Sequence, residues 1–451
     1  MLKSLKFPIG VATMYNPGFI ISLIVLFIFL NSCSPVNFPT LKNTKVINEN
    51  NTITNEEDEE ENEIIIKEVK KEKIQKPKIS FSNIELQKKI SIILPAEKKH
   101  KITKQFINII ELAIYEKKIK DISFDIELYN DSNDLRNIIN NNLSPGKIFI
   151  GPLDSVETKI LNDYCKSGVL FFAFSSQKNL AKNCIFLLNF FPENELKTIF
   201  DNFPVGSKIA LLYPENVYGY KINLLVDDIA DKSDSIIVNR ASYKDDLTNV
   251  REAIKLLGKY ELRKYELDRQ KNLLKLKDDE KSLKRLKKLE RFQTTKDFDF
   301  THVLLPDYGI RLLQVAPLLA YYDVDPNVVQ FVGTGAWDDP VFFSEPSLQN
   351  AIFPGVEIKK RQNLINEYNN IYESKLMRTS TLPYDLIGLL SYMFKEKMSL
   401  NEVYNLLNNQ DIKFNGIDGG FYFKNNIIER ELEILQITDG KAIKLNRNKI
   451  N

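Results

Sequence analysis

Residues that could do acid–base, nucleophilic or metal chemistry are few in this chain. Its 451 residues include two histidines and three cysteines. His100 and His302 are far apart in the sequence, so no catalytic triad or metal-ligand set forms around them. Spacings typical of zinc hydrolases, thiol redox sites, serine hydrolases and phosphate-binding loops do not occur. The sequence therefore predicts a protein that is not an enzyme and has no cofactor and no metal site.

The first cysteine, Cys33, closes an apolar run near the N-terminus. The run Phe19–Leu30 follows a basic leader, and the letters LNSC lead into the cysteine. A bilayer-spanning helix needs about 20 apolar residues, so this run is too short to span but suits the core of a signal peptide. We expect either cleavage next to the cysteine or, alternatively, an uncleaved anchor with an incidental thiol.

The same segment resembles the bacterial lipoprotein signal, in which an aliphatic residue, two small residues and a cysteine mark cleavage. The resemblance implies that residues 1–32 are removed and that Cys33 becomes a lipidated N-terminus, with acyl chains such as palmitate anchoring it to a membrane. In enteric lipoproteins of this kind an Asp after the cysteine retains the protein in the inner membrane. Ser34 therefore indicates the periplasmic face of the outer membrane.

The other two cysteines, Cys165 and Cys184, are expected at one edge of a sheet, away from any ligand cleft. The first ends a predicted helix, and the second begins a predicted strand. An oxidising compartment would allow a disulfide closing a loop of about 20 residues, worth roughly 3 kcal/mol. Two buried free thiols remain the alternative.

The chain changes character after the apolar run and again near residue 87. Residues 33–86 lack apolar periodicity and carry an acidic block followed by a basic block, which is typical of a disordered, charged tether. From Lys88–Pro95 onward, short apolar runs alternate with amphipathic helical patterns such as Ile102–Glu116. Such alternation predicts an α/β fold with parallel sheets covered on both faces.

A second set of strands and helices begins near residue 194, and the chain ends in the predicted hairpin Gly419–Ile437. We expect a two-lobed, type I periplasmic binding protein-like fold with doubly wound parallel sheets. The predicted parts are lobe 1 (87–193 and 356–412) and lobe 2 (194–355 and 413–447). Ligands of such folds lie at the carboxyl ends of the strands, between the lobes.

A charged helical segment, predicted over residues 248–292, interrupts lobe 2. Two helices are expected there, with a break at Lys277. Either their leucines pack against each other in a solvated hairpin, or the hairpin is a docking arm for a partner protein. Nucleic-acid binding is not expected, because acidic residues interleave with the basic ones and the net charge of the chain is only +2. The leucines at helical spacing are Leu262, Leu267, Leu273, Leu274, Leu283, Leu286 and Leu289.

Four blocks stand out in the folded part of the chain: IGPLDS (Ile150–Ser155), Val303–Pro326, FVGTGAWDDP (Phe331–Pro340) and Gly419–Leu435. Together they resemble the penicillin-binding protein activator family of bacterial lipoproteins, in the alphaproteobacterial form. The resemblance covers roughly residues 88–440, and Val303–Pro340 is its longest block. It implies the two-lobed fold and a role in binding and stimulating a peptidoglycan synthase. The best-known members carry an additional N-terminal helical domain where this chain has the tether.

Amino-acid-binding relatives of this fold use hydroxyls after the third and fourth strands and an acid in the second lobe. Hydroxyls bind a carboxylate and an acid binds an ammonium group. By that resemblance the possible ligand residues are Ser155, Ser175, Ser176 and Asp307. Trp337 and Asp338 follow a glycine-flanked turn and either line the cleft or form a turn around a packed indole.

The sequence thus supports two functions of different kinds. The favoured one is a lipid-anchored regulator that binds and activates a penicillin-binding protein. The alternative is a solute-binding protein for an amino-acid-type ligand of an importer or sensor. The proteins that co-purify with the native lipoprotein would distinguish the two, because a penicillin-binding protein supports the first function and an ABC permease contradicts it.

Overall fold

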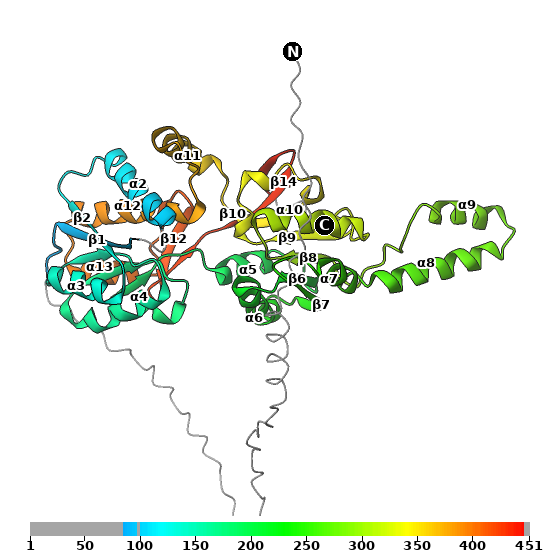
Figure 1. The fold of residues 1–451 in the computed structure, drawn as a ribbon, viewed down its shortest axis with the longest axis horizontal. Coiled ribbons are helices and arrows are strands. Elements are labelled where there is room, and N and C mark those ends of the chain that lie inside the picture. Colours follow the sequence, from blue (N-terminus) through cyan, green and yellow to red (C-terminus); the bar gives the residue numbers. More distant parts are fainter. Residues whose placement is uncertain (1–83, 97–99, 446–451) are drawn as a thin grey trace, which may run out of the picture. The chain divides into compact units, whose positions relative to one another are not determined.

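The computed structural model describes residues 84–96 and 100–445 (Figure 1). They belong to one compact unit, residues 75–451. The predicted signal peptide, lipidation site Cys33 and most of the predicted tether lie outside the described residues. Among the described helices, none is both long and apolar enough to cross a bilayer.

Lobe 1 is built on an eight-stranded sheet with the order β11-β12-β13-β5-β4-β3-β1-β2. Strands β2, β1, β3, β4 and β5 are parallel. Figure 1 shows α2 and α12 on one side of this sheet and α3 and α4 on the other. The strands are β1 (Lys89–Pro95), β2 (Ser123–Tyr129), β3 (Ile148–Ile150), β4 (Leu170–Ala173), β5 (Ile185–Leu187), β11 (Phe414–Gly416), β12 (Gly419–Lys424) and β13 (Ile427–Arg430). The helices are α2 (His100–Glu116), α3 (Ser132–Asn142), α4 (Ser155–Ile160), α11 (Lys359–Tyr372), α12 (Leu382–Lys395) and α13 (Leu400–Asn408), with the 3-10 segments η1 (Leu161–Ser167) and η6 (Arg378–Thr381).

Lobe 2 is built on a seven-stranded sheet with the order β15-β14-β10-β9-β8-β6-β7. Successive side chains of β6 point to opposite faces, so Ile209 and Leu211 enter one core while Ala210 and Leu212 enter another. Helices α5 and α6 cover the first face, and α7 and α10 cover the second. The strands are β6 (Lys208–Pro214), β7 (Ile236–Tyr243), β8 (His302–Leu305), β9 (Gln330–Gly333), β10 (Ile352–Gly355), β14 (Glu433–Thr438) and β15 (Lys441–Lys444). The helices are α5 (Pro192–Phe200), α6 (Val217–Lys232), α7 (Val250–Leu257) and α10 (Gly309–Tyr321).

The predicted boundary of lobe 2 at residue 413 is wrong. Strands β11, β12 and β13 belong to the sheet of lobe 1, and the chain enters lobe 2 only with β14. The physical reason is that β13 pairs in parallel with β5, matching Ile427 with Leu187, while Phe423 is buried in the core of lobe 1. The turn between β12 and β13 is formed by Asn425 and Asn426, both with positive φ.

The helical insertion is shorter than predicted. Helix α7 belongs to the core of lobe 2, so residues 250–257 are not part of the insertion. The inserted arm consists of α8 (Tyr260–Lys275) and α9 (Glu280–Leu289), which pack against each other. The Asp279 carboxylate caps α9 by accepting a hydrogen bond from the Ser282 amide at 2.9 Å. Figure 1 shows this arm extending from lobe 2.

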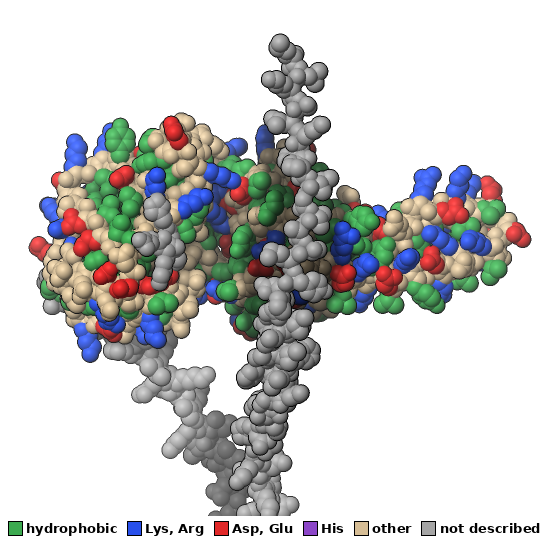
Figure 2. Space-filling view, viewed as in Figure 1, with side chains coloured by type: hydrophobic (Ala, Val, Ile, Leu, Met, Phe, Trp, Pro, Cys, Tyr) green, Lys and Arg blue, Asp and Glu red, His purple; other side chains and the backbone are tan. Residues whose placement is uncertain are grey.

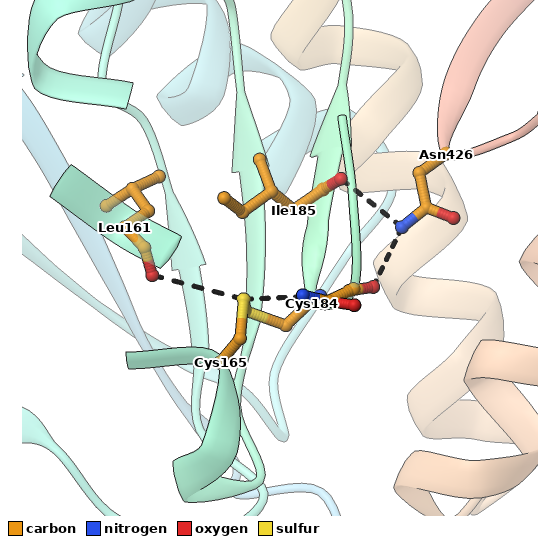
Figure 3. The surroundings of a disulfide bond; sticks show 6 residues. Leu161, Cys165, Cys184, Ile185 and Asn426 are labelled. Carbon is orange, nitrogen blue, oxygen red and sulfur yellow. Dashed lines mark hydrogen bonds between the residues drawn. A yellow bond between two sulfur atoms is a disulfide. The ribbon is translucent and has the colours of Figure 1, made fainter. Parts of the chain in front are cut away.

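A disulfide joins Cys165 and Cys184, whose Cα atoms are 5.2 Å apart (Figure 3). Cys165 lies within η1, two residues before its end, and Cys184 immediately precedes β5. Both are buried, and the Cys184 amide donates a hydrogen bond of 3.3 Å to the Cys165 sulfur. Nearby, the Asn426 side chain donates to the Asn183 carbonyl at 2.8 Å, which connects the disulfide region to the β12–β13 turn.

Candidate functional site

A cavity of about 910 Å³ lies between the two lobes. Lobe 2 lines it with residues that follow strand ends, among them Tyr218, Tyr308 and Asp338. Lobe 1 contributes the start of α11 and the segment around η6. Phe190, from the connection between β5 and α5, lies where the chain first crosses between lobes. The cavity therefore occupies the position expected for a ligand in this fold, beyond the carboxyl ends of the strands.

Arg361 makes the best-buried ion pair across the cavity. This residue of α11 donates from Nη2 to Asp338 of lobe 2 at 2.6 Å and from Nη1 to Asp418 of lobe 1 at 3.0 Å. The side chains of Arg361 and Asp338 are only 4% and 2% exposed. A planar guanidinium held by two carboxylates at once fixes both distance and orientation. The pair therefore joins the lobes at a defined point.

Arg378 makes a second connection between the lobes. Its Nη1 lies 3.3 Å from Oε1 of Glu195, a buried residue of α5, and also donates to the Gly335 carbonyl. The Gly335 amide donates to the other Glu195 oxygen at 3.0 Å. The guanidinium lies 4.1 Å from the centre of the Phe190 ring. The Arg378 guanidinium therefore contacts a carboxylate, a backbone carbonyl and the face of an aromatic ring at the same time.

Burial shifts the proton affinities of several groups in this network. It raises the pKa of Glu195, an effect that the nearby Arg378 opposes. It likewise raises the pKa of Asp385, which accepts a hydrogen bond of 3.0 Å from Arg430. For Arg361 burial lowers the pKa, but Asp338 and Asp418 outweigh it and the net shift is upward. The Arg361 guanidinium therefore stays charged, whereas Glu195 and Asp385 are destabilised as anions.

The three serines predicted to bind a carboxylate lie outside the cavity lining described above. Ser155 and Ser175 bond to each other, with 2.8 Å between their hydroxyl oxygens. Ser175 is fully buried, whereas Ser176 is exposed and its carbonyl accepts from Lys221 of lobe 2 at 3.4 Å. The structure brings the first two together, as their place after β3 and β4 requires. It does not bring them to the cavity.

Asp307, the acid predicted to bind an ammonium group, is buried inside lobe 2. It accepts hydrogen bonds from the Tyr243 hydroxyl at 2.6 Å and from Arg311 Nη2 at 2.6 Å. Its carbonyl accepts from the indole of Trp337 at 3.1 Å. Trp337 is fully buried in the core of lobe 2, as the packed-indole alternative predicts. Of the predicted ligand residues, Asp338 is the one among the cavity-lining residues.

Arg361, Arg378, Glu195 and Phe190 were not predicted from the sequence. Each lies near the start of a helix or in a connection, where charged and aromatic residues are ordinary. Within residues 84–96 and 100–445, no cluster of three or more His, Cys, Asp or Glu side chains could hold a metal ion. The charged side chains that line the cavity from both lobes, such as Arg361 and Asp338, form ion pairs and hydrogen bonds with each other.

Comparison with known proteins identifies the fold. No family model matches the chain, and no curated protein matches it either. Among solved structures, one described as a branched-chain amino acid ABC transporter from Rhodospirillum rubrum superposes with a TM-score of 0.59 at 12% identity, covering 80% of this chain and 100% of that one. The chain has the type I periplasmic binding protein-like fold.

Structures of LpoA from Haemophilus influenzae are also similar. The C-domain, described as a regulator of PBP1A, matches with a TM-score of 0.53 at 14% identity, covering 79% of this chain and 100% of that domain. Full-length LpoA gives a TM-score of 0.53 at 12% identity, and the match covers 81% of this chain and 60% of LpoA. These likenesses confirm the predicted two-lobed fold.

Proposed function

We propose that this protein is a lipid-anchored regulator that binds and activates a penicillin-binding protein in the periplasm, without catalysing a reaction itself. Two observations support this function. The sequence blocks resemble the penicillin-binding protein activator family, and the fold is shared with LpoA, whose C-domain is described as a regulator of PBP1A. Because the fold is also shared with a protein described as an ABC transporter, the choice between the two functions rests on the contacts inside the cavity.

The observation that carries the proposal is the pairing of charges between the lobes. A solute-binding cleft uses a few placed polar or charged groups to orient its ligand. Here Arg361 is bonded to Asp338, and Arg378 to Glu195. Replacing such buried partners with a ligand would first leave charges unpaired, which costs several kcal/mol (about 3–5) per broken pair. These pairs favour a rigid two-lobed body that acts through its outer surface.

The lipid anchor and the tether would determine how far from the membrane the two-lobed domain can act. In this proposal residues 1–32 are removed, Cys33 carries the lipid in the outer membrane, and residues 33–86 link it to the lobes. About 50 residues have a coil dimension near 40 Å and a stretched length near 170 Å. A domain on such a tether can meet a synthase well away from its own membrane surface.

The test is isolation of the native lipoprotein from membranes in mild detergent, followed by identification of what accompanies it. We expect a penicillin-binding protein, and adding the purified lipoprotein to that synthase should raise its rate of peptidoglycan synthesis. A chain with Cys33→Ser, added in solution, separates anchoring from activation. Recovery of an ABC permease in place of a synthase would contradict the proposal.

The alternative, a solute-binding protein for an amino-acid-type ligand, keeps one observation in its favour. The cavity of about 910 Å³ is large enough for such a ligand, and the Arg361 Nε atom has no hydrogen-bond partner among the described residues. Thermal unfolding with a panel of amino acids tests it, because a ligand at 100 times its Kd stabilises by about 2.7 kcal/mol. If no amino acid raises the Tm, this alternative fails.

A further inference from the structure

The helical arm carries an apolar surface that the arm itself does not cover. On α8, Leu267 is buried, and Leu274 is half-buried on the same face. Four large apolar side chains stay exposed to solvent, three of them on the opposite side of α8 and the fourth at its C-terminal cap residue, Leu276. They are Leu262 (66% exposed), Tyr265 (69%), Leu273 (50%) and Leu276 (83%). With Arg269, which lies among them, they are called the α8 stripe below.

Helical geometry explains why these residues form one line. With 3.6 residues per turn, positions 262, 265, 269, 273 and 276 fall within a narrow sector of the helix surface. The sector containing Leu267 and Leu274 points elsewhere, and α9 packs on α8. Figure 2 shows hydrophobic side chains along the lower edge of the arm, where Figure 1 places α8, and Lys and Arg side chains along its upper edge. Leucines packing within the arm therefore account for only part of its leucine content.

The spacing of the α8 stripe is symmetric about Arg269. Leu262 and Leu276 lie seven residues on either side of it, and Tyr265 and Leu273 lie four residues on either side. An antiparallel copy of the same helix, related by a twofold axis through residue 269, would place Leu262 against Leu276 and Tyr265 against Leu273. A twofold interface requires such self-complementarity, since each patch must meet itself.

Charges beside the α8 stripe favour the same arrangement. In an antiparallel pair, Glu261 of one copy lies next to Lys275 of the other, at both ends of the contact. A parallel pair would instead place Glu261 beside Glu266 of the other copy, which brings like charges together. At the centre, Arg269 is neutralised within its own helix by two hydrogen bonds of 2.8 Å to Glu266. A single polar residue at the centre of an apolar seam is a common means of fixing register.

We propose that a second copy of this chain binds the α8 stripe, forming an antiparallel pair of α8 helices with Arg269 on the twofold axis. The contact spans about two heptads, so it is smaller than the roughly 1,600 Å² of a standard stable interface. The dimer is therefore reversible and forms at high local concentration. This proposal is independent of the regulatory function and of the cavity between the lobes.

Site-directed cross-linking tests the register. The full chain is used in mild detergent, with Cys33→Ser in every variant so that the introduced thiol is the only free one beside the disulfide. Arg269→Cys should give several-fold more disulfide-linked dimer than Leu283→Cys, a matched control in α9 with 52% exposure. Leu262→Cys mixed with Leu276→Cys should cross-link to each other, while neither cross-links with itself.

Sedimentation velocity at rising concentration tests the association without added thiols. We expect dimer at about 100 µM, a range suited to a contact of this size. Leu276→Glu should weaken association at least tenfold, whereas Leu224→Glu, an equally exposed leucine on α6, should not change it. A monomer at all concentrations, equal cross-linking of Arg269→Cys and Leu283→Cys, or self-cross-linking of Leu262→Cys would overturn the proposal.

Discussion

The junction between the lobes and the helical arm differ in which side chains they bury and which they expose. At the junction, charged side chains are buried, and lobe 1 neutralises lobe 2 through Arg361–Asp338 and Arg378–Glu195. On the arm, most charged side chains are exposed to solvent, and so is Leu276 on its apolar face. The charges at the junction are paired within the protein, whereas the apolar side chains of the α8 stripe stay in water until another surface covers them.

This difference shows where an interacting molecule would meet the protein. A buried pair of charges resists replacement, because the first step of any exchange leaves a charge without a partner. An exposed apolar side chain gains free energy from any contact that removes it from water. External binding is therefore expected on surfaces such as the arm, and the junction is expected to hold the lobes in one arrangement.

The largest expected effect comes from removing the buried cation at the junction. Arg361→Met leaves Asp338 and Asp418 without their shared partner, so the free energy of unfolding should fall by about 3–5 kcal/mol. Lys375→Met removes a cation that also joins the lobes, through Asp339 at 2.9 Å, but its side chain is 70% exposed. That variant should lose at most about 1 kcal/mol. Urea unfolding at pH 7 measures both, and equal losses would contradict the distinction between the two pairs.

The disulfide inside lobe 1 provides a stability contribution with which the buried ion pairs of the junction can be compared. The disulfide closes a loop with a sequence separation of 19, so replacing both Cys165 and Cys184 with Ser should cost about 3 kcal/mol. A reducing agent should lower the Tm of the natural chain and leave that of the double variant unchanged. If reduction shifted both equally, the agent would be acting elsewhere. Self-association through α8 should be the same in both chains.

The free energy of unfolding should depend on pH through Glu195, which lies at the junction between the lobes. Because burial raises the pKa of Glu195 in the folded state, this group stabilises the fold most when protonated, below its unfolded value of about 4.3. That contribution is lost as pH rises through the raised folded value, at about 1.4 kcal/mol for each pKa unit of difference.

Glu195→Gln isolates this effect. The free energy of unfolding should fall less steeply with rising pH in Glu195→Gln than in the natural chain, over the range just above pH 4.3. His302 acts in the opposite direction, since burial lowers its pKa to about 4, but it is common to both chains and cancels in the difference. Parallel pH profiles would show that Glu195 does not titrate differently on unfolding.

The smallest expected effect lies on the arm. Leu276→Glu replaces an exposed side chain, so the stability of the monomer should stay within about 0.5 kcal/mol of the natural value. Leu267→Glu, on the buried face of the same helix, should cost several times more. Unfolding at low micromolar concentration measures the monomer alone. A large loss for Leu276→Glu would mean that the α8 stripe already packs against the protein.

Much of the fold follows from local patterns in the sequence. Strand β1 is predicted as Lys88–Pro95 and lies at Lys89–Pro95, because an isoleucine-rich run buried on both faces has few alternatives. No helix is predicted over Val217–Lys232 (α6) or Leu400–Asn408 (α13), although both helices have local start signals. Asn216 caps α6 by accepting from the Gly219 amide at 2.9 Å, and Ser399 forms a capping box with Glu402 at the start of α13.

The cavity could not be read from the sequence in the same way. The predicted serines follow strands, as the fold requires, but Arg361 and Arg378 reach the cavity only because α11 and η6 return to lobe 1 after the second crossing. That path depends on which sheet receives each later segment. The hairpin is predicted in the wrong lobe for the same reason. Its pairing of Ile427 with Leu187 joins residues 240 positions apart in the sequence, and no local pattern indicates such a contact.

The position of β13 also has a consequence for the timing of biosynthesis. This strand lies inside the first sheet, between β12 and β5, and not at its edge. The ribosome makes β1 to β5 early, yet their sheet stays incomplete until residues 427–430 have emerged. Contacts so distant in sequence form slowly, because the chain between them must first be ordered. The N-terminal lobe of the protein is therefore among the last parts to reach its final form.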